Sequence, residues 1–123
     1  MKAVKIPGPD HPITVTSEAR RVTVTLNGEI IAQTTLALAL KEASYPAMYY
    51  IPRADANMDR LTRTAHATYC PYKGDCAYFT IEAGGTTLEN AVWTYENPYA
   101  AVAQIKDHLA FYPNRVEIDV APL

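Results

Sequence analysis

The chain has 123 residues, which predicts one domain spanning residues 1–123 rather than two. Its 11 Lys and Arg against 13 Asp and Glu give a net charge of -2, which provides no long-range field for nucleic acid or an anionic membrane. Hydrophobic residues make up 49% of the chain, enough for a real core, yet no apolar run approaches the roughly 20 residues of a membrane helix. We therefore expect neither nucleic acid nor a membrane as a partner.

The start of the chain predicts an extended arm over residues 1–12, because this stretch contains three prolines. It lacks the hydrophobic region of a secretory signal. The two cysteines, Cys70 and Cys76, are too few for a disulfide scaffold or a structural zinc site. A reducing cytoplasm is therefore the expected location.

Alternating β-branched and aromatic segments between Gly, Pro and Asn turns predict a mainly β fold. The expected strands are residues 13–17, 22–26, 29–33, 47–51, 76–82, 90–95 and 115–120. Residues 34–43 alternate Leu with Ala, which fits a strand, although both residues also favour helix. We prefer the extended form there, and we interpret residues 53–63 as a loop with one helical turn.

Asn27-Gly28 predicts a type I′ hairpin, because both residues tolerate positive φ. A two-residue loop would pair Val24 with Ile31 and Thr25 with Ile30.

Asn97-Pro98 predicts the start of a helix, with Asn as N-cap and Pro at the first helical position. Apolar side chains between Val102 and Tyr112 recur at helical spacing, so we expect a helix over about 98–112. The predicted architecture is a small antiparallel barrel-like or folded sheet with this one C-terminal helix and a final strand.

Tyrosine is unusually dense, with nine Tyr against two Phe and one Trp, and most of the tyrosines lie between residues 45 and 78. A buried Tyr must find a partner for its hydroxyl, whereas Phe has no such cost. This excess of tyrosine therefore predicts either a hydrated pocket lined by aromatic rings or rings packed on a sheet with their hydroxyl groups at the edge of the packing.

The turn Cys70-Pro71-Tyr72-Lys73-Gly74 is the densest chemical cluster of the sequence. The Lys73 ammonium could favour the Cys70 thiolate, or it could hold an anionic ligand as a point charge. The plainer interpretation makes Cys70 a small buried residue and Lys73 a solvated one. Both are weak candidates for catalysis.

Arg53 follows a strand and a proline, where its guanidinium could bind a carboxylate or phosphate through two hydrogen bonds. A salt bridge to Asp55 or Asp59 is the alternative. The two aspartates would share one face if the segment were helical and could then chelate a metal, but a solvated face is preferred. No Gly-rich phosphate loop or metal-ligand motif is present, so no cofactor and no metal is expected.

Six segments of the chain carry a resemblance to a known family. They are Arg20-Arg21-Val22, Tyr50-Ile51-Pro52-Arg53, Thr68-Tyr69-Cys70-Pro71-Tyr72-Lys73-Gly74, Tyr78, Asn90-Ala91-Val92-Trp93-Thr94-Tyr95 and Ala110-Phe111-Tyr112. Together they resemble a bacterial and fungal family that is catalogued as domain of unknown function number four-two-seven. The similarity covers roughly residues 18–121, and the Cys-Pro-Tyr-Lys-Gly stretch is its most specific mark.

The resemblance implies a compact β-rich domain without an established activity. Some descriptions of the family use the label nucleotidyltransferase domain. Classical nucleotidyl transfer uses a Gly-Ser turn and Asp-x-Asp carboxylates that hold metal ions, and this sequence contains neither.

Our first functional hypothesis is a pocket beside the Cys70–Gly74 turn that binds a small anionic ligand, with any reaction left open. Its expected binding residues are Tyr50, Arg53, Tyr72, Lys73, Tyr78, Trp93 and Tyr95. One alternative is a non-catalytic interaction or structural module, acting as a monomer or homodimer. The other is nucleotidyl transfer with a metal at Asp55 and Asp59.

Overall fold

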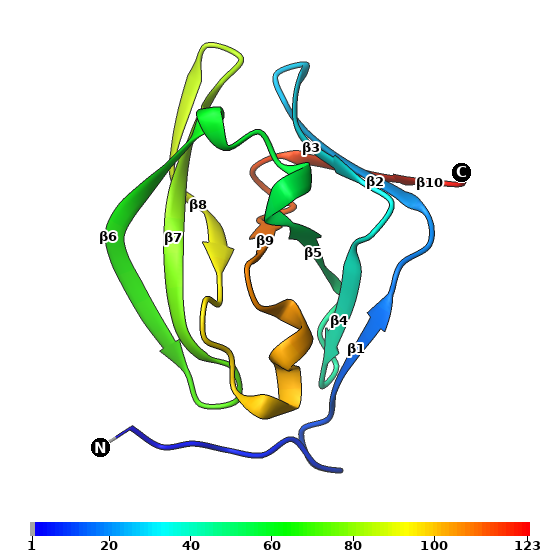
Figure 1. Cartoon of the computed structure of the whole chain (residues 1–123), viewed down its shortest axis with the longest axis vertical. Helices are drawn as coiled ribbons and strands as arrows, with labels where there is room; N and C mark the ends of the chain where they lie inside the picture. The colour runs from blue at the N-terminus through cyan, green and yellow to red at the C-terminus, as the bar shows by residue number, and fades with distance from the viewer. Residues whose placement is uncertain (1) are drawn as a thin grey trace.

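The computed structural model describes residues 2–123, which form strands in two antiparallel sheets with little helix (Figure 1). The larger sheet has seven strands in the order β1-β4-β5-β9-β8-β7-β6, and the smaller has three in the order β10-β2-β3. The strands are β1 (Ile13–Ser17), β2 (Arg21–Leu26), β3 (Glu29–Thr34), β4 (Leu38–Glu42), β5 (Met48–Pro52), β6 (Leu61–Cys70), β7 (Gly74–Ala83), β8 (Thr86–Thr94), β9 (His108–Phe111) and β10 (Glu117–Ala121). Three 3-10 helices, η1 (Arg53–Asp55), η2 (Met58–Arg60) and η3 (Ala100–Ile105), complete the described elements.

The mainly β prediction is confirmed, and the folded sheet is the correct form of it. Within residues 2–123 the larger sheet stays open, with β1 and β6 at its edges, and does not close into a barrel. None of the helices in this part of the chain has the length and apolar character needed to cross a bilayer.

The Asn27-Gly28 hairpin forms as predicted, with φ of 49° at Asn27 and 85° at Gly28. Thr25 pairs with Ile30 as expected, but Val24 pairs with Ala32 rather than with Ile31. The strand β3 bulges at this point, so one residue more stands on β3 than on β2. The bulge allows both Ile31 and Ala32 to be buried, which regular alternation would forbid.

The helix expected over 98–112 is wrong in extent and in type. Only Ala100–Ile105 is helical, as a 3-10 segment interrupted by non-helical backbone at Val102. The chain then reverses at Asp107, where φ is 56°, and His108–Phe111 forms β9 between β5 and β8. The backbone of β9 pairs with strands on both sides, and this pairing outweighs the helical spacing of its apolar residues.

Two other ambiguous segments are also resolved. Residues 34–43 contain β4, so the extended form is correct. Residues 53–63 contain the short turns η1 and η2 and then the start of β6 at Leu61. The ten-residue strand β6 was largely missed, because its middle is polar and exposed.

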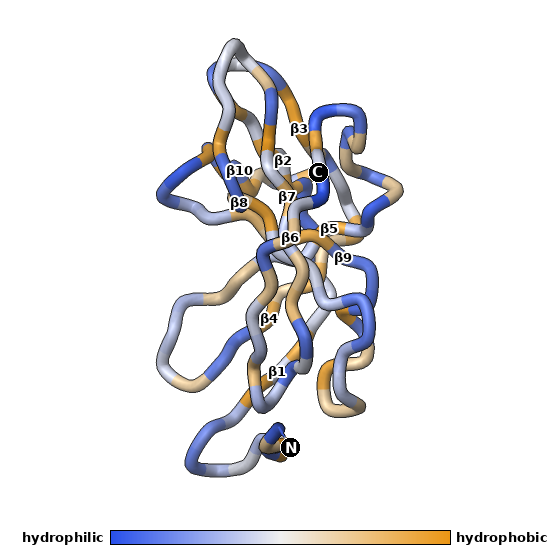
Figure 2. Tube along the Cα trace, turned by 90° about the vertical axis from the view of Figure 1, so that its left-hand side faces the viewer, coloured by the Kyte–Doolittle hydropathy of each residue, from blue (hydrophilic) through white to orange (hydrophobic). Residues whose placement is uncertain are grey.

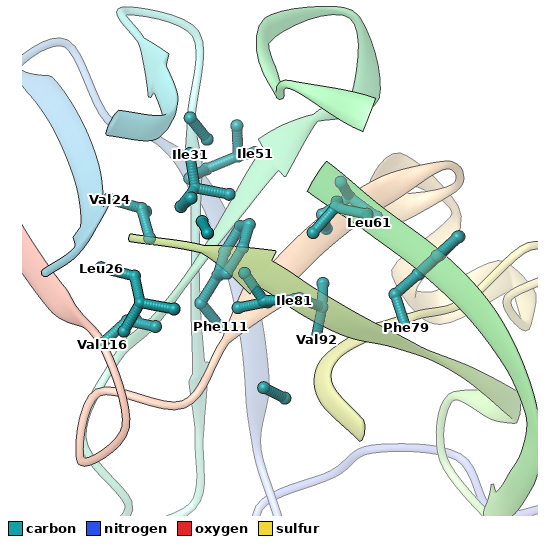
Figure 3. Close-up of a cluster of buried hydrophobic side chains, with 14 of the residues drawn as sticks. Val24, Leu26, Ile31, Ile51, Leu61, Phe79, Ile81, Val92, Phe111 and Val116 are labelled. Atoms are coloured by element: carbon teal, nitrogen blue, oxygen red, sulfur yellow. The ribbon is translucent and has the colours of Figure 1, made fainter. Parts of the chain in front are cut away.

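Two hydrophobic cores lie on opposite faces of the larger sheet, because neighbouring residues of one strand belong to different cores. Ile51 and Phe79 lie in the first core, whereas Tyr50 and Tyr78, one position earlier, lie in the second. The first core fills the space beneath β2 and β3, where side chains such as Ile31, Ile81 and Phe111 converge (Figure 3). Figure 2 shows hydrophobic segments meeting in the middle of the molecule, while many peripheral loops are hydrophilic.

The second core is rich in tyrosine and is closed by η3, whose Val102 and Ile105 are fully buried. The N-terminal arm runs below it and the β6–β7 turn (Figure 1). The Lys5 amide donates a hydrogen bond of 2.9 Å to the Pro71 carbonyl of that turn. The second core therefore brings together β4, β5, η3 and the Cys70–Gly74 turn, and the arm is bonded to that turn.

Candidate functional site

A cavity of about 390 Å³ opens beside the second core, and aromatic rings form most of its wall. We refer to it as the aromatic cavity. Its lining residues are Leu40, Glu42, Tyr45, Pro46, Met48, Tyr50, Lys73, Tyr78, Trp93, Tyr95 and Tyr112.

The strand register brings the central rings to one face of the sheet. Trp93 of β8 pairs directly with Tyr78 of β7 on one side and with Ala110 of β9 on the other. Ala110 carries only a methyl group, so Trp93 and Tyr50 of β5 can meet across β9. Trp93 Nε1 donates a hydrogen bond of 3.1 Å to the Tyr50 hydroxyl, and the two rings lie edge to face at 6.3 Å between centroids.

Three phenols of the cavity, those of Tyr50, Tyr78 and Tyr95, are held in their neutral form by burial. Burial raises the pKa of Tyr78 to about 12, although its hydrogen bond of 2.9 Å with Thr68 acts in the opposite direction. Burial also raises the pKa of Tyr50 and of Tyr95. These three residues therefore offer neutral rings and hydroxyl dipoles at physiological pH, and the ion pair of the wall is formed by Lys73 and Glu42.

Lys73 is buried, with 8% of its surface exposed, and its ammonium forms an ion pair with the Glu42 carboxylate. The ammonium also lies 6.0 Å from the centre of the Tyr95 ring. The turn that carries Lys73 is anchored by the Tyr99 amide, which donates a 3.0 Å hydrogen bond to the Lys73 carbonyl. Gly74 then adopts a φ of 109°, and an added Cβ would lie 3.3 Å from the Asn97 carbonyl oxygen.

The ion pair of Lys73 and Glu42 is also connected to the N-terminal arm, because the second carboxylate oxygen of Glu42 lies 2.7 Å from His11 Nε2. Burial acts to raise the pKa of Glu42, but hydrogen bonds from Lys73 and His11 outweigh it and lower the pKa below its usual value. The His11 ring stacks on Tyr72 at 4.2 Å, with an angle of 8° between the ring planes. Three segments distant in sequence therefore meet at one carboxylate.

The structure brings most of the predicted binding residues together. Those that line the aromatic cavity are Tyr50, Lys73, Tyr78, Trp93 and Tyr95. Arg53 and Tyr72 are not part of the lining. Arg53 lies 5.3 Å from the Phe79 ring centre and 3.7 Å from Glu96, on the side of the first core, and Tyr72 stacks on His11.

The remaining predicted residues lie elsewhere. Cys70 is half-buried at the margin of the second core, outside the cavity lining. Asp55 and Asp59 lie on two separate 3-10 turns, so the shared helix face required by the metal hypothesis does not form. Asp55 instead accepts a hydrogen bond of 2.7 Å from the Thr34 hydroxyl.

Sequence reasoning missed Glu42, the residue that sets the charge balance of the cavity. Its partner Lys73 is 31 positions away, and no local pattern connects the two. It also missed the apolar wall, formed by Leu40, Met48 and Pro46. Alternation along residues 38–42 could have placed Leu40 and Glu42 on one face, but only the tertiary fold shows what that face contacts.

No curated protein matches the chain. A family model described as a domain of unknown function (DUF427) matches residues 14–121, which run from β1 through the last residue of β10. The matched span includes both Lys73 and Glu42, whereas His11 precedes it. Because the match covers nearly the whole chain and all the strands that build the aromatic cavity, the chain belongs to the DUF427 family.

Proposed function

We propose that this protein binds a small molecule with an anionic group in the aromatic cavity, with Lys73 as the residue that holds the anion. The observation that carries the proposal is a buried ammonium that faces an aromatic hollow and pairs with one carboxylate. An ammonium has three N–H donors, and a carboxylate or phosphate of a ligand can accept from those that Glu42 does not use. The neutral rings then cover the rest of the ligand.

The charge arrangement supports an anionic rather than a cationic ligand. Both carboxylate oxygens of Glu42 already have donors, one from Lys73 and one from His11. Among residues 2–123 the Lys73 ammonium donates to Glu42, which leaves N–H donors of the ammonium for an anion of the ligand. A cavity of about 390 Å³ is also within the size range of small-molecule sites.

The test is isothermal titration with acetate, benzoate, 4-hydroxybenzoate and phenyl phosphate. We expect at least one of the aromatic anions to bind, and acetate to bind more weakly because it leaves the rings uncovered. In Lys73→Met the affinity should fall by roughly tenfold or more, since a charge-assisted hydrogen bond is lost. In Glu42→Gln it should rise, because the anion that competes for Lys73 is removed.

The matched control is Lys106→Met, which removes an exposed cation next to η3 and should leave the affinity unchanged. Circular dichroism establishes that each variant is folded. The proposal fails if none of the aromatic anions binds the wild-type protein, or if folded Lys73→Met binds them as tightly as the wild type does.

A further inference from the structure

A second hollow, of about 430 Å³, lies on β6, β7 and β8 and has an entirely polar lining. We refer to it as the polar groove. Its wall consists of four threonines, two glutamates, His66 and Asn90. Every residue of this wall carries a side-chain group that can donate or accept a hydrogen bond.

The polar groove adjoins the aromatic cavity on the same face of the larger sheet. Tyr78 and Thr80 are two positions apart on β7, so their side chains point to one face. Tyr78 lines the cavity and Thr80 lines the groove. The ring of His66, also in the groove wall, lies 4.5 Å from the Tyr78 ring. Tyr78 is therefore the border between the two hollows.

Two irregularities of strand pairing create the polar groove. Residues 64–66 of β6 stand opposite the single residue Tyr78, and residues 89–91 of β8 stand opposite the single residue Thr80. The strands on both sides of β7, β6 and β8, thus carry surplus residues close to each other, opposite Tyr78 and Thr80. Strand bulges occur preferentially next to binding and active sites, where they redirect side chains.

The surplus residues supply half of the groove wall and are ordered by hydrogen bonds. The Thr64 hydroxyl donates a 2.6 Å hydrogen bond to Asn90 Oδ1, and the backbone N–H of Asn90 donates a 3.3 Å hydrogen bond to the Thr80 hydroxyl. With its oxygen engaged, the Asn90 side chain presents its NH₂ donors, while Glu82 and Glu89 present acceptors. A wall that holds both donors and acceptors matches vicinal hydroxyl groups, each of which both donates and accepts.

We infer that the polar groove is a second subsite for the same ligand and takes a polyhydroxylated arm, such as a sugar, attached to the anionic part. This inference rests on the proposed function, because it assumes that the anionic part lies in the aromatic cavity. The ligand class is then a glycoside or polyol conjugate of a small aromatic acid. Its acid part would lie in the aromatic cavity, its hydroxylated part in the polar groove, and the bond between them beside the Tyr78–His66 contact.

The test compares two matched probes, 4-hydroxybenzoate and its O-β-glucoside, by isothermal titration. The glucoside should bind roughly tenfold more tightly, equivalent to one or two net hydrogen bonds. Thr80→Val and, separately, the exposed Thr87→Val should each remove part of this gain, while the affinity for 4-hydroxybenzoate stays unchanged. Lys73→Met should lower the affinity for both probes.

The possible outcomes separate the two proposals. If 4-hydroxybenzoate binds and the glucoside gains nothing, the second subsite is refuted and the aromatic cavity stands. If the gain persists in both threonine variants, the sugar contacts another surface and the inference is likewise overturned. If neither probe binds, both the subsite and the aromatic-acid ligand class are refuted.

Discussion

Glu42 lies at the junction of the aromatic cavity, the Cys70–Gly74 turn and the N-terminal arm, so its ionisation should matter for stability. Its pKa in the folded state is lower than the usual value of 4.5. A depressed pKa contributes stability that is present above the unfolded-state pKa and is lost as pH falls through the folded-state pKa.

We therefore expect Glu42→Gln to lower the free energy of unfolding by about 1–2 kcal/mol at pH 7. The difference from the wild type should shrink between pH 7 and pH 3, because the wild-type carboxyl becomes protonated as pH falls through its lowered folded-state pKa. Urea unfolding at the two pH values measures both differences. Glu82→Gln, at an exposed position, is the control and should change stability by less than about 0.5 kcal/mol. A penalty for Glu42→Gln that is equal at both pH values would contradict this role of its charge.

The two cysteines should differ in reactivity, because they differ in burial. Cys76 is 3% exposed, and burial raises its pKa, whereas Cys70 is half-buried. Only the thiolate reacts rapidly with alkylating reagents, so iodoacetamide at pH 8 should modify Cys70 well before Cys76. Peptide mass spectrometry over a time course reads the two sites separately. Faster labelling of Cys76 would show that the second core opens more readily than its packing implies.

At the scale of elements, the hairpin turns at Asn27-Gly28 and Gly84-Gly85 are packed against each other. Gly84 has a φ of 56°, and an added Cβ would lie 2.6 Å from the Leu26 carbonyl oxygen and 2.7 Å from Asn27 Cβ. Gly85 has a φ of 75°, but its added Cβ would meet nothing within 4 Å. Substitution of Gly85 therefore tests backbone strain alone, whereas substitution of Gly84 tests backbone strain together with a steric clash.

Gly85→Ala should lower the free energy of unfolding by about 1–2 kcal/mol, because a residue with a side chain is strained in the left-handed backbone conformation. Gly84→Ala should cost a further ~1–3 kcal/mol, because the turns must also move apart. Thermal unfolding of both variants beside the wild type gives the ranking. Equal losses in the two variants would mean that the turns do not depend on this close approach.

At the scale of the whole molecule, the first core is the structure that joins the two sheets. Ile81 of β7 is fully buried there, whereas Ile30 of β3 is 51% exposed. The same substitution at the two positions therefore compares burial alone.

Ile81→Ala should lower the free energy of unfolding by about 2–5 kcal/mol, through lost hydrophobic transfer and the cavity left behind. Ile30→Ala should cost less than about 1 kcal/mol, since half of its surface already contacts water. Urea denaturation curves test both values. If both variants lost the same stability, the first core would not be the joint between the sheets.

Several features were predictable because they depend on neighbouring residues. The Asn27-Gly28 hairpin follows from two residues that tolerate positive φ, and β2 follows from alternation of β-branched residues. The density of tyrosine predicted either an aromatic pocket or packing of polar-tipped rings on a sheet, and Tyr50, Tyr78 and Tyr95 line one cavity.

Features that depend on distant partners were not predictable. Leu109 has helical spacing relative to Val102 and Ile105, yet it lies on β9, because the backbone there pairs with β5 on one side and β8 on the other. The interior of β6 is polar, so its strand state depends on pairing with β7 rather than on its own pattern.

Local patterns were enough to predict a mainly β chain, its hairpin turn at Asn27-Gly28 and the aromatic and cationic side chains available for a site. The pairing of Lys73 with Glu42 inside a cavity, and of Arg53 with Glu96 outside it, depends on the folded arrangement of the strands. The physical reason is that turns and alternation arise from interactions between close neighbours in sequence. The partner of a charged side chain is instead set by strand order, which depends on how the whole chain buries its apolar surface.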